Sequence, residues 1–266
     1  MRILPRLILA FVAAFSAAAQ STHERILVPV FFSGPGAHGS QWWTTVSVAN
    51  NGETPVRFTR DVLAGDPDCP AICGCGPVAE VHSGNVGELC ILNADPSGLL
   101  LYMEKNQADV HFGARVADLS RSNDTAGTEL RVVREHELRK NSIILPNIPI
   151  GPGYRVGLRL FDTFPPPNPE VILRIHDRRE LGIPLVEETI PLSLPPDAFE
   201  PRPAHPAFAM IGDLGARYPQ LQSHGLVVIE LILPELDISP VPAPSYWAVA
   251  TITNNVTQQV TMVTPQ

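Results

Sequence analysis

The sequence lacks the local motifs that mark most catalytic centres. It contains no G-x-S-x-G nucleophile elbow, no H-E-x-x-H metal motif, no P-loop and no dinucleotide fingerprint. Neither a bound metal nor a cofactor is therefore predicted. Catalytic groups can also be assembled from residues far apart in the sequence. The absence of motifs thus favours a non-enzymatic protein, with a secreted hydrolase as the third choice.

Basic surface and long apolar segments are also scarce. Lysine and arginine number 19 against 27 aspartate and glutamate residues, which gives a formal net charge of -8. Such a balance provides no basic stripe for phosphate backbones, so no nucleic acid partner is expected. Past the N-terminus, the longest apolar run extends from Leu226 to Leu233 and contains Glu230. A bilayer-spanning helix needs about 20 apolar residues, so we expect no integral membrane segment in the mature chain.

The N-terminus carries the pattern of a secretory signal. Arg2 and Arg6 precede an apolar stretch from Leu7 to Phe15, and the small residues Ser16 to Ala19 follow. This is the order of charged region, apolar region and cleavage site in signal peptides. We therefore predict a signal peptide over residues 1–19 and an exported, periplasmic or extracellular protein.

Proline is abundant, with 28 in 266 residues. It removes a backbone donor and is excluded from helix interiors and central strands, so the fold class predicted is all-β with short strands. Apolar and polar residues alternate over Val110 to Val116 and Tyr154 to Leu160, as in half-buried strands. Only Ile211 to Tyr218 predicts a short helix. Further strands are expected at 26–32, 42–49, 56–59, 88–92, 99–103, 129–134, 143–145, 171–176, 185–192, 226–233, 246–253 and 257–263.

The four cysteines are clustered in one segment, at Cys69, Cys73, Cys75 and Cys90. In an exported chain this favours two disulfides, whose three possible pairings the sequence does not separate. The spacing does not match the paired C-x2-C pattern of structural zinc sites, so a metal is less favoured.

An internal repeat places Trp42 to Asn51 over Tyr246 to Asn255. The second tryptophan and both asparagines coincide, although chance similarity is the alternative. Each copy predicts a strand, an asparagine turn and a returning strand, and Asn51-Gly52 is a strong hairpin signal.

The strand that ends in the segment Asn50 to Val56 resembles the V-x-V-x-N-x-G turn of immunoglobulin-like modules in secreted bacterial proteins. The resemblance implies two immunoglobulin-like β-sandwich domains and export, and it implies no active site. We place the domains at residues 20–139 and 140–266, with the boundary in the polar segment 135–141. The chain lacks the cysteine that antibody-type domains carry on each of two facing strands.

Candidates for chemistry are few. His176-Asp177 is a candidate for half of an acid–base dyad, and His111 with His136 is a candidate pair across strands, but the sequence nominates no nucleophile for either. A surface turn is the simpler interpretation of His176, and His111 should face solvent. The acidic segments Asp66 to Asp68 and Asn123-Asp124 supply too few ligands for a calcium loop.

The tryptophans offer the remaining ligand-binding candidates. Trp42 and Tyr246 share a face with apolar strand residues, which predicts equivalent buried positions. Trp43 and Trp247 lie on the opposite, more polar face, where an aromatic ring stacks on a sugar or covers the sheet. We therefore expect a binding or structural module whose partner is a protein or a surface glycan, with carbohydrate binding as the alternative function.

Overall fold

The computed structural model describes residues 22–35, 39–59, 78–89, 97–107, 109–120, 127–198, 203–233 and 245–265. The fold is all-β, as predicted, and the described helices are short. The bounds of the elements are β1 His23–Val28, β2 Ser33–Pro35, β3 Gln41–Asn50, β4 Val56–Thr59, β5 Val78–Val81, β6 Val86–Glu88, β7 Leu99–Glu104, β8 Val110–Asp118, β9 Thr128–Leu130, β10 Val133–Arg134, the 3-10 helix η4 Glu135–Glu137, β11 Ser142–Pro149, β12 Tyr154–Asp162, β13 Glu170–Asp177, β14 Val186–Pro191, β15 Ala207–Ile211, α2 Leu214–Arg217, the 3-10 helix η5 Pro219–Ser223, β16 Leu226–Ile232, β17 Tyr246–Asn254 and β18 Val260–Val263.

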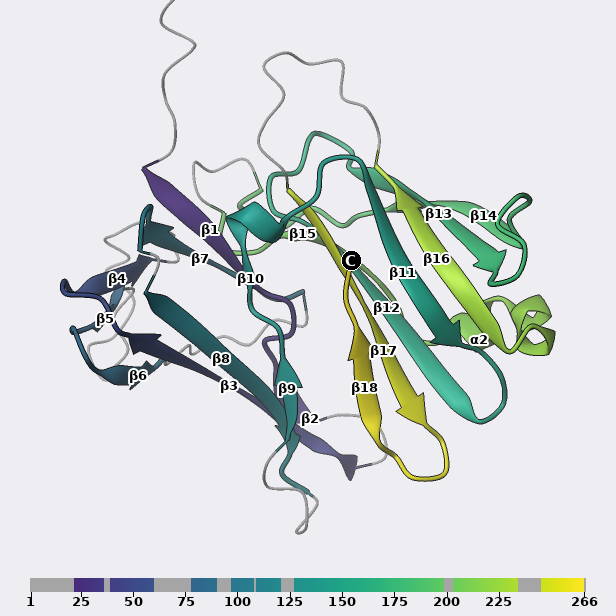
Figure 1. Ribbon diagram of the computed structural model, residues 1–266, viewed down its shortest axis with the longest axis horizontal. Coiled ribbons are helices and arrows are strands. Elements are labelled where there is room, and N and C mark those ends of the chain that lie inside the picture. The colour runs from purple at the N-terminus through teal and green to yellow at the C-terminus, as the bar shows by residue number, and fades with distance from the viewer. Residues whose placement is uncertain are drawn as a thin grey trace, which may run out of the picture.

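The described strands form four antiparallel sheets that divide into two pairs along the chain. Strands β1 to β10 make the β1 sheet, in the order β10-β1-β7-β4-β5, and the β3 sheet, in the order β2-β3-β8-β9 with β6 also on β3. Strands β11 to β18 make the β12 sheet, in the order β15-β12-β17-β18, and the β13 sheet, in the order β11-β16-β13-β14. We call these sets the N-terminal half and the C-terminal half, which lie side by side in Figure 1.

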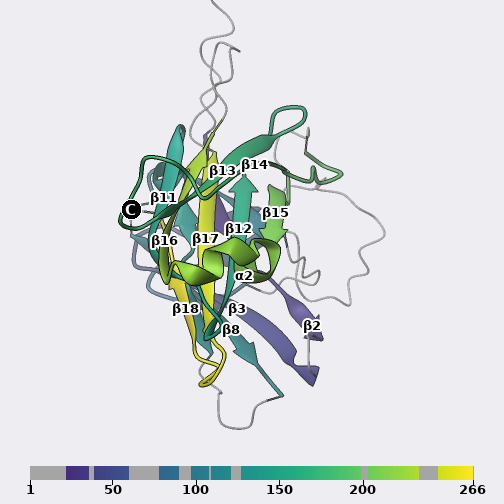
Figure 2. The same cartoon turned by 90° about the vertical axis from the view of Figure 1, so that its right-hand side faces the viewer.

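Each half has a core that both of its sheets supply. In the N-terminal half, Phe58 from the β1 sheet and Val46 from the β3 sheet are buried in one apolar cluster. In the C-terminal half, Leu158 from the β12 sheet and Leu173 from the β13 sheet share another. The alternating strand pattern therefore buries one face of each sheet against its partner, as in a β-sandwich. Helix α2 lies across the C-terminal half in Figure 2.

A third apolar cluster joins the two halves. It packs side chains of β1, β7 and β10 against β12 and β17, and its buried members are Leu27, Leu100, Tyr102, Val133, Leu138, Phe161, Trp247 and Val249. The rings of Phe161 and Trp247 lie 6.3 Å apart between centroids. Backbone groups also meet across the junction, because the Leu100 amide donates to the Ala204 carbonyl over 2.9 Å.

A polar network lies beside this junction. The Arg25 guanidinium donates to Thr163 Oγ1 over 3.0 Å and pairs with Glu135 Oε1 at 3.1 Å. The Thr163 hydroxyl in turn donates to the Ser245 carbonyl over 3.1 Å. These bonds join both halves and η4. Because the charged groups are largely buried, removing one partner would leave the other without compensation, at a high cost in free energy.

The hairpin predicted at Asn51-Gly52 is wrong. Strand β3 pairs with β2, β6 and β8, whereas β4 pairs with β5 and β7 in the opposite sheet. The physical reason is the fully buried Asn50, whose Nδ2 donates to the Thr54 and Val81 carbonyls and whose Oδ1 accepts from the Gly52 amide. These bonds fix the segment between β3 and β4, which passes from the β3 sheet to the β1 sheet.

The second copy of the repeat does form the expected hairpin, since β17 pairs with β18. The Asn254 side chain accepts hydrogen bonds from the Val256 and Thr257 amides, 2.9 and 3.0 Å away. Here the asparagine organises a local turn and leaves the two strands adjacent.

Other predicted elements need smaller corrections. The strand predicted at 129–134 is two short strands, β9 and β10, in different sheets. In the segment predicted to be helical, Ile211 ends β15 and the helix covers only Leu214–Arg217, capped by Asp213. Within the described residues no helix has both the length and the apolar character needed to cross a membrane. The predicted signal peptide, residues 1–19, lies outside the described residues.

Candidate functional site

The two halves enclose a cleft of about 500 Å³ beyond the apolar cluster that joins them. The N-terminal half lines it with Val30, Phe32, Pro35, Trp42, Val116 and Thr128. The C-terminal half lines it mainly with residues of β12, β15, β17 and β18. Ligand sites are commonly concave, largely apolar and located between domains, and this volume lies in their usual range.

The floor of the cleft is the outer face of the β12 sheet. On β12, Val156 and Leu158 point into the core, so Arg155, Gly157 and Arg159 occupy the opposite face. In the strand register, Arg155 lies opposite Thr253, Gly157 opposite Thr251 and Arg159 opposite Val249. Two arginines and two threonines therefore lie along a surface that is otherwise mostly apolar.

Gly157 keeps this surface open between the two arginines. A Cβ atom at this position would lie 2.8 Å from Thr251 Oγ1, closer than real Cβ atoms approach. The Thr251 hydroxyl instead lies over the strand, 3.4 Å from the Gly157 carbonyl. The glycine thus allows the two strands to pack closely and leaves a gap in the row of side chains.

The charge of the cleft is positive. Of its described lining residues, Arg155 and Arg159 are charged and none is acidic. Burial lowers the pKa of the Arg159 guanidinium below its usual value, because the charged form loses hydration. The group stays protonated, since arginine does not lose its proton in proteins. The cleft therefore contrasts with the acidic protein as a whole.

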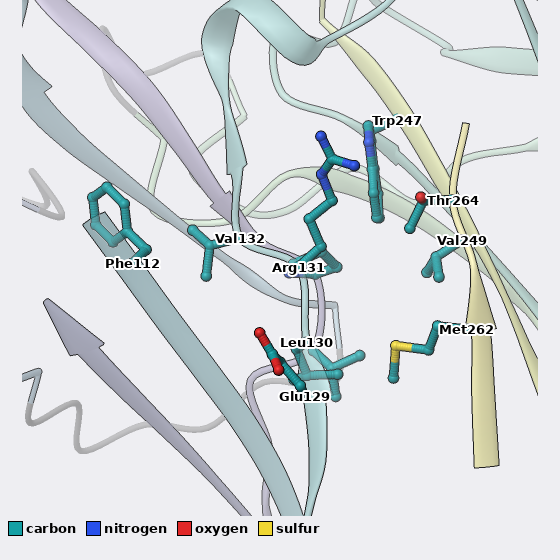
Figure 3. Close-up of a pocket in the computed structure, with 11 residues that line it drawn as sticks. Phe112, Glu129, Leu130, Arg131, Val132, Trp247, Val249, Met262 and Thr264 are labelled. Carbon is teal, nitrogen blue, oxygen red and sulfur yellow. The ribbon is translucent and has the colours of Figure 1, made fainter. Parts of the chain in front are cut away.

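A second hollow of about 410 Å³ adjoins the cleft and shares Val30 and Met262 with it. Figure 3 shows Arg131 extending toward Trp247, with Glu129 below it on the same segment. Arg131 also pairs with Glu137. The lining of this hollow contains one basic residue, Arg131, and one acidic residue, Glu129, so the hollow lacks the net positive charge of the cleft.

The tryptophan predictions have mixed outcomes. Tyr246 is buried in the core as expected, whereas Trp42 is half-buried and lines the cleft. Trp43 is 46% exposed on the outer face of the β3 sheet. Trp247 lies on the face opposite Tyr246, as predicted, but the N-terminal half covers it and leaves it only 3% exposed.

The histidine candidates do not form a catalytic pair. His176 is buried rather than in a surface turn, and its Nε2 lies 3.2 Å from Glu230 Oε2. Asp177 instead contacts His224 Nδ1 at 2.8 Å. The pKa of Asp177 is lowered by its hydrogen bond from the Arg179 amide and then by His224.

The other two histidines lie elsewhere in the N-terminal half. His111 is exposed on β8, as expected, and His136 lies on η4, 3.8 Å from Glu24 Oε1. Across the part of the chain that the structure describes, no three His, Cys, Asp or Glu residues are grouped so that they could hold a metal ion. The predicted disulfide cysteines 69, 73, 75 and 90 and the acidic segments 66–68 and 123–124 lie outside that part.

Sequence reasoning missed Arg155 and Arg159 as site residues. Their alternation with Val156 and Leu158 correctly assigned them to the polar face of a strand. Nothing local indicated that the other half of the molecule would stand over that face. Comparison with known protein families, with curated proteins and with solved structures gives no match.

Proposed function

We propose that this chain is an exported, non-enzymatic binding module with its ligand site in the cleft between the halves. In this proposal the halves are two immunoglobulin-like β-sandwich domains, at residues 20–139 and 140–266. The strand pairing supports the division, because all pairs of the named strands lie within one half. The N-terminal sequence supports export.

The observation that carries the proposal is the joint lining of the cleft. Its walls come from both halves, and Phe32 and Trp42 on one side face a surface that includes Met210 on the other. The apolar cluster and the Arg25 network fix the halves in contact next to it. A cleft between fixed walls needs little reordering to accept a ligand, which favours binding.

The proposal of a non-enzymatic role has support from the histidines. His176 contacts a glutamate and Asp177 contacts a different histidine, so each is engaged in its own pair. Both pairs lie in the β13 sheet and its adjoining loop, and none of these residues lines the cleft. The described geometry therefore nominates a place for binding without nominating an acid–base group in it.

The test uses a neutral apolar fluorescent probe, N-phenyl-1-naphthylamine, titrated into the purified protein. We expect saturable one-to-one binding that weakens at least about tenfold in Met210→Glu, because an apolar ligand seated against the new carboxylate would remove its hydration. The matched control is Ile144→Glu on β11 of the β13 sheet. Its side chain is 48% exposed, against 52% for Met210, and it does not line the cleft. Equal binding by both variants and the unmodified protein, or no binding at all, would reject the cleft as the site.

Carbohydrate binding is the second candidate, and Trp43 favours it. The ring lies on an outer sheet face, where its cross-strand neighbours are the small residues Ser33 and Ala117. Small neighbours leave an aromatic face accessible for stacking on a sugar ring. Affinity electrophoresis in gels containing soluble polysaccharides tests this: retardation lost in Trp43→Ala supports the role, and unchanged mobility on every gel counts against it.

A further inference from the structure

We infer that the cleft selects a small amphipathic anion, with its apolar body between Trp42 and Met210 and its negative group held by Arg155 and Arg159. This inference rests on the proposed binding function and names the class of ligand. It uses two features that coincide in one place: an apolar hollow built by both halves, and two cations on its floor.

The arginines are positioned to act on one ligand. Residues four apart on a strand have Cα atoms about 13 Å apart and point to the same face. Arginine side chains are long enough to converge over part of that distance, and only Gly157 lies between them on this face. A carboxylate, sulfonate or phosphate between them would accept charge-assisted hydrogen bonds from planar guanidinium donors.

The two arginines differ in solvent exposure, so they should contribute unequally to anion binding. Arg155 is exposed near the mouth of the cleft, whereas Arg159 is half-buried and lies opposite Met210 and Val249 in the sheet. An ion pair at Arg159 is therefore less screened by water than one at Arg155. We expect Arg159 to contribute more to affinity.

The remaining lining residues determine the rest of the ligand. Phe32, Trp42 and Met262 supply aromatic and flexible apolar surface beside the arginines. A free inorganic anion would leave this apolar surface in contact with water, and a purely apolar molecule would add no hydrogen bond to the arginines beside it. A molecule with both parts matches both surfaces.

A matched pair of probes tests the inference. 8-Anilino-1-naphthalenesulfonate has the aromatic body of N-phenyl-1-naphthylamine with one added sulfonate, so the ratio of their affinities isolates the contribution of the anion. We expect the sulfonate probe to bind the purified protein about tenfold more tightly at low salt. That advantage should fall as salt rises, whereas binding of the neutral probe should not.

Variants locate the effect. Relative to the affinity for the neutral probe, the affinity for the sulfonate probe should fall about tenfold in Arg159→Gln and about threefold in Arg155→Gln. Arg178→Gln, in an exposed turn outside the cleft, is the control and should change neither probe. Circular dichroism and a urea melt establish that each variant is folded, and the salt titration of the unmodified protein requires no variant.

The outcomes separate the two proposals. If the neutral probe binds in the cleft but the sulfonate gives no advantage, or if the arginine variants leave the advantage intact, the anion inference fails and the binding proposal stands. If neither probe binds, both fail.

Discussion

One face of the β12 sheet is covered at one end and open at the other. At the covered end, Phe161 and Trp247 lie under the N-terminal half with at most 3% of their surface exposed. At the open end of the same two strands, Arg155 and Thr253 line a cleft. The same two strands thus form an interface at one end and line a candidate ligand site at the other. The side chains at each end account for the difference.

The difference shows how two halves can pack against each other and still leave a cleft between them. Large rings at the covered end bury apolar area, which favours association by about 25 cal/mol for each Å². Cationic and small residues at the open end gain little from such contact, because a buried arginine loses hydration. The halves are therefore held together at one end and remain apart at the other.

The largest expected effect is at the covered end. Trp247→Ala should lower the free energy of unfolding by about 3 to 5 kcal/mol, because it leaves a cavity between the halves. Its partner in the sequence repeat, Trp43, is largely accessible, and Trp43→Ala should cost about 0.5 kcal/mol or less. Urea unfolding curves measure both. Similar losses in the two variants would show that the interface contributes no more than the open surface.

The second-largest loss in the free energy of unfolding is expected in the polar network at the covered end. Arg25→Met should cost about 3 kcal/mol, since it leaves the Glu135 carboxylate partly buried without its cation. The Arg25 and Glu135 side chains are 10% and 18% exposed. The control is Arg57→Met, which removes an exposed pair with Glu80 and should cost at most about 1 kcal/mol. If the control lost as much stability as Arg25→Met, burial would not be the cause.

Asp162, at the covered end of β12, gives the interface a pH dependence. Burial raises the pKa of its carboxyl group, and the hydrogen bond from the Phe164 amide only partly opposes this. The folded state therefore binds its proton more tightly than the unfolded state. Stability should fall as the pH rises from about 4, the unfolded pKa, through the raised pKa, by at most about 1.4 kcal/mol per pH unit.

Unfolding curves across this pH range for the unmodified protein and Asp162→Asn check the effect, because the asparagine variant should lack the downward slope. The same slope in the Asp162→Asn variant and the unmodified protein would contradict the assignment of the pH dependence to Asp162.

Asp177 should have the opposite effect, because its pKa is lowered in the folded state. Its contribution to stability should be present above about pH 4 and lost as the pH falls through the lowered pKa.

Gly157 lies on the floor of the cleft, and its replacement should have a moderate effect. Gly157→Ala should cost about 1 to 2 kcal/mol, because the new Cβ would contact Thr251 Oγ1. Adding Thr251→Ala should recover part of that loss. At Gly182 an added Cβ would meet nothing within 4 Å, so Gly182→Ala should be close to neutral. No recovery in the double variant would mean that the hydroxyl is not the obstacle.

The smallest expected effect is at the mouth of the cleft. Arg155→Gln should change the free energy of unfolding by less than about 0.5 kcal/mol, because its side chain is exposed. Thermal and urea unfolding measure this change. A loss above about 1 kcal/mol would indicate that Arg155 stabilises the fold, and the contrast between the covered and open ends would no longer hold.

Local pattern was sufficient for the class of fold and for many strand positions. Alternation placed Val156 and Leu158 on the buried face of β12, and it placed Tyr246 in the core. These predictions succeed because the two-residue period of a strand depends only on neighbouring residues. The asparagine turns were found as turns, but their consequences differ: Asn254 closes a hairpin, and the buried Asn50 sends the chain to another sheet.

The residue pattern alone is sufficient to predict an all-β chain with short strands and to identify the apolar face of several of them. That Trp247 is buried on the polar face of β17, and that the polar face of β12 lines a cleft, follows from tertiary packing. The pattern of a strand specifies which side chains favour burial, whereas the segment that covers a face comes from residues far away in the chain. Trp42 and Arg155 share one cleft although 113 positions separate them in the sequence.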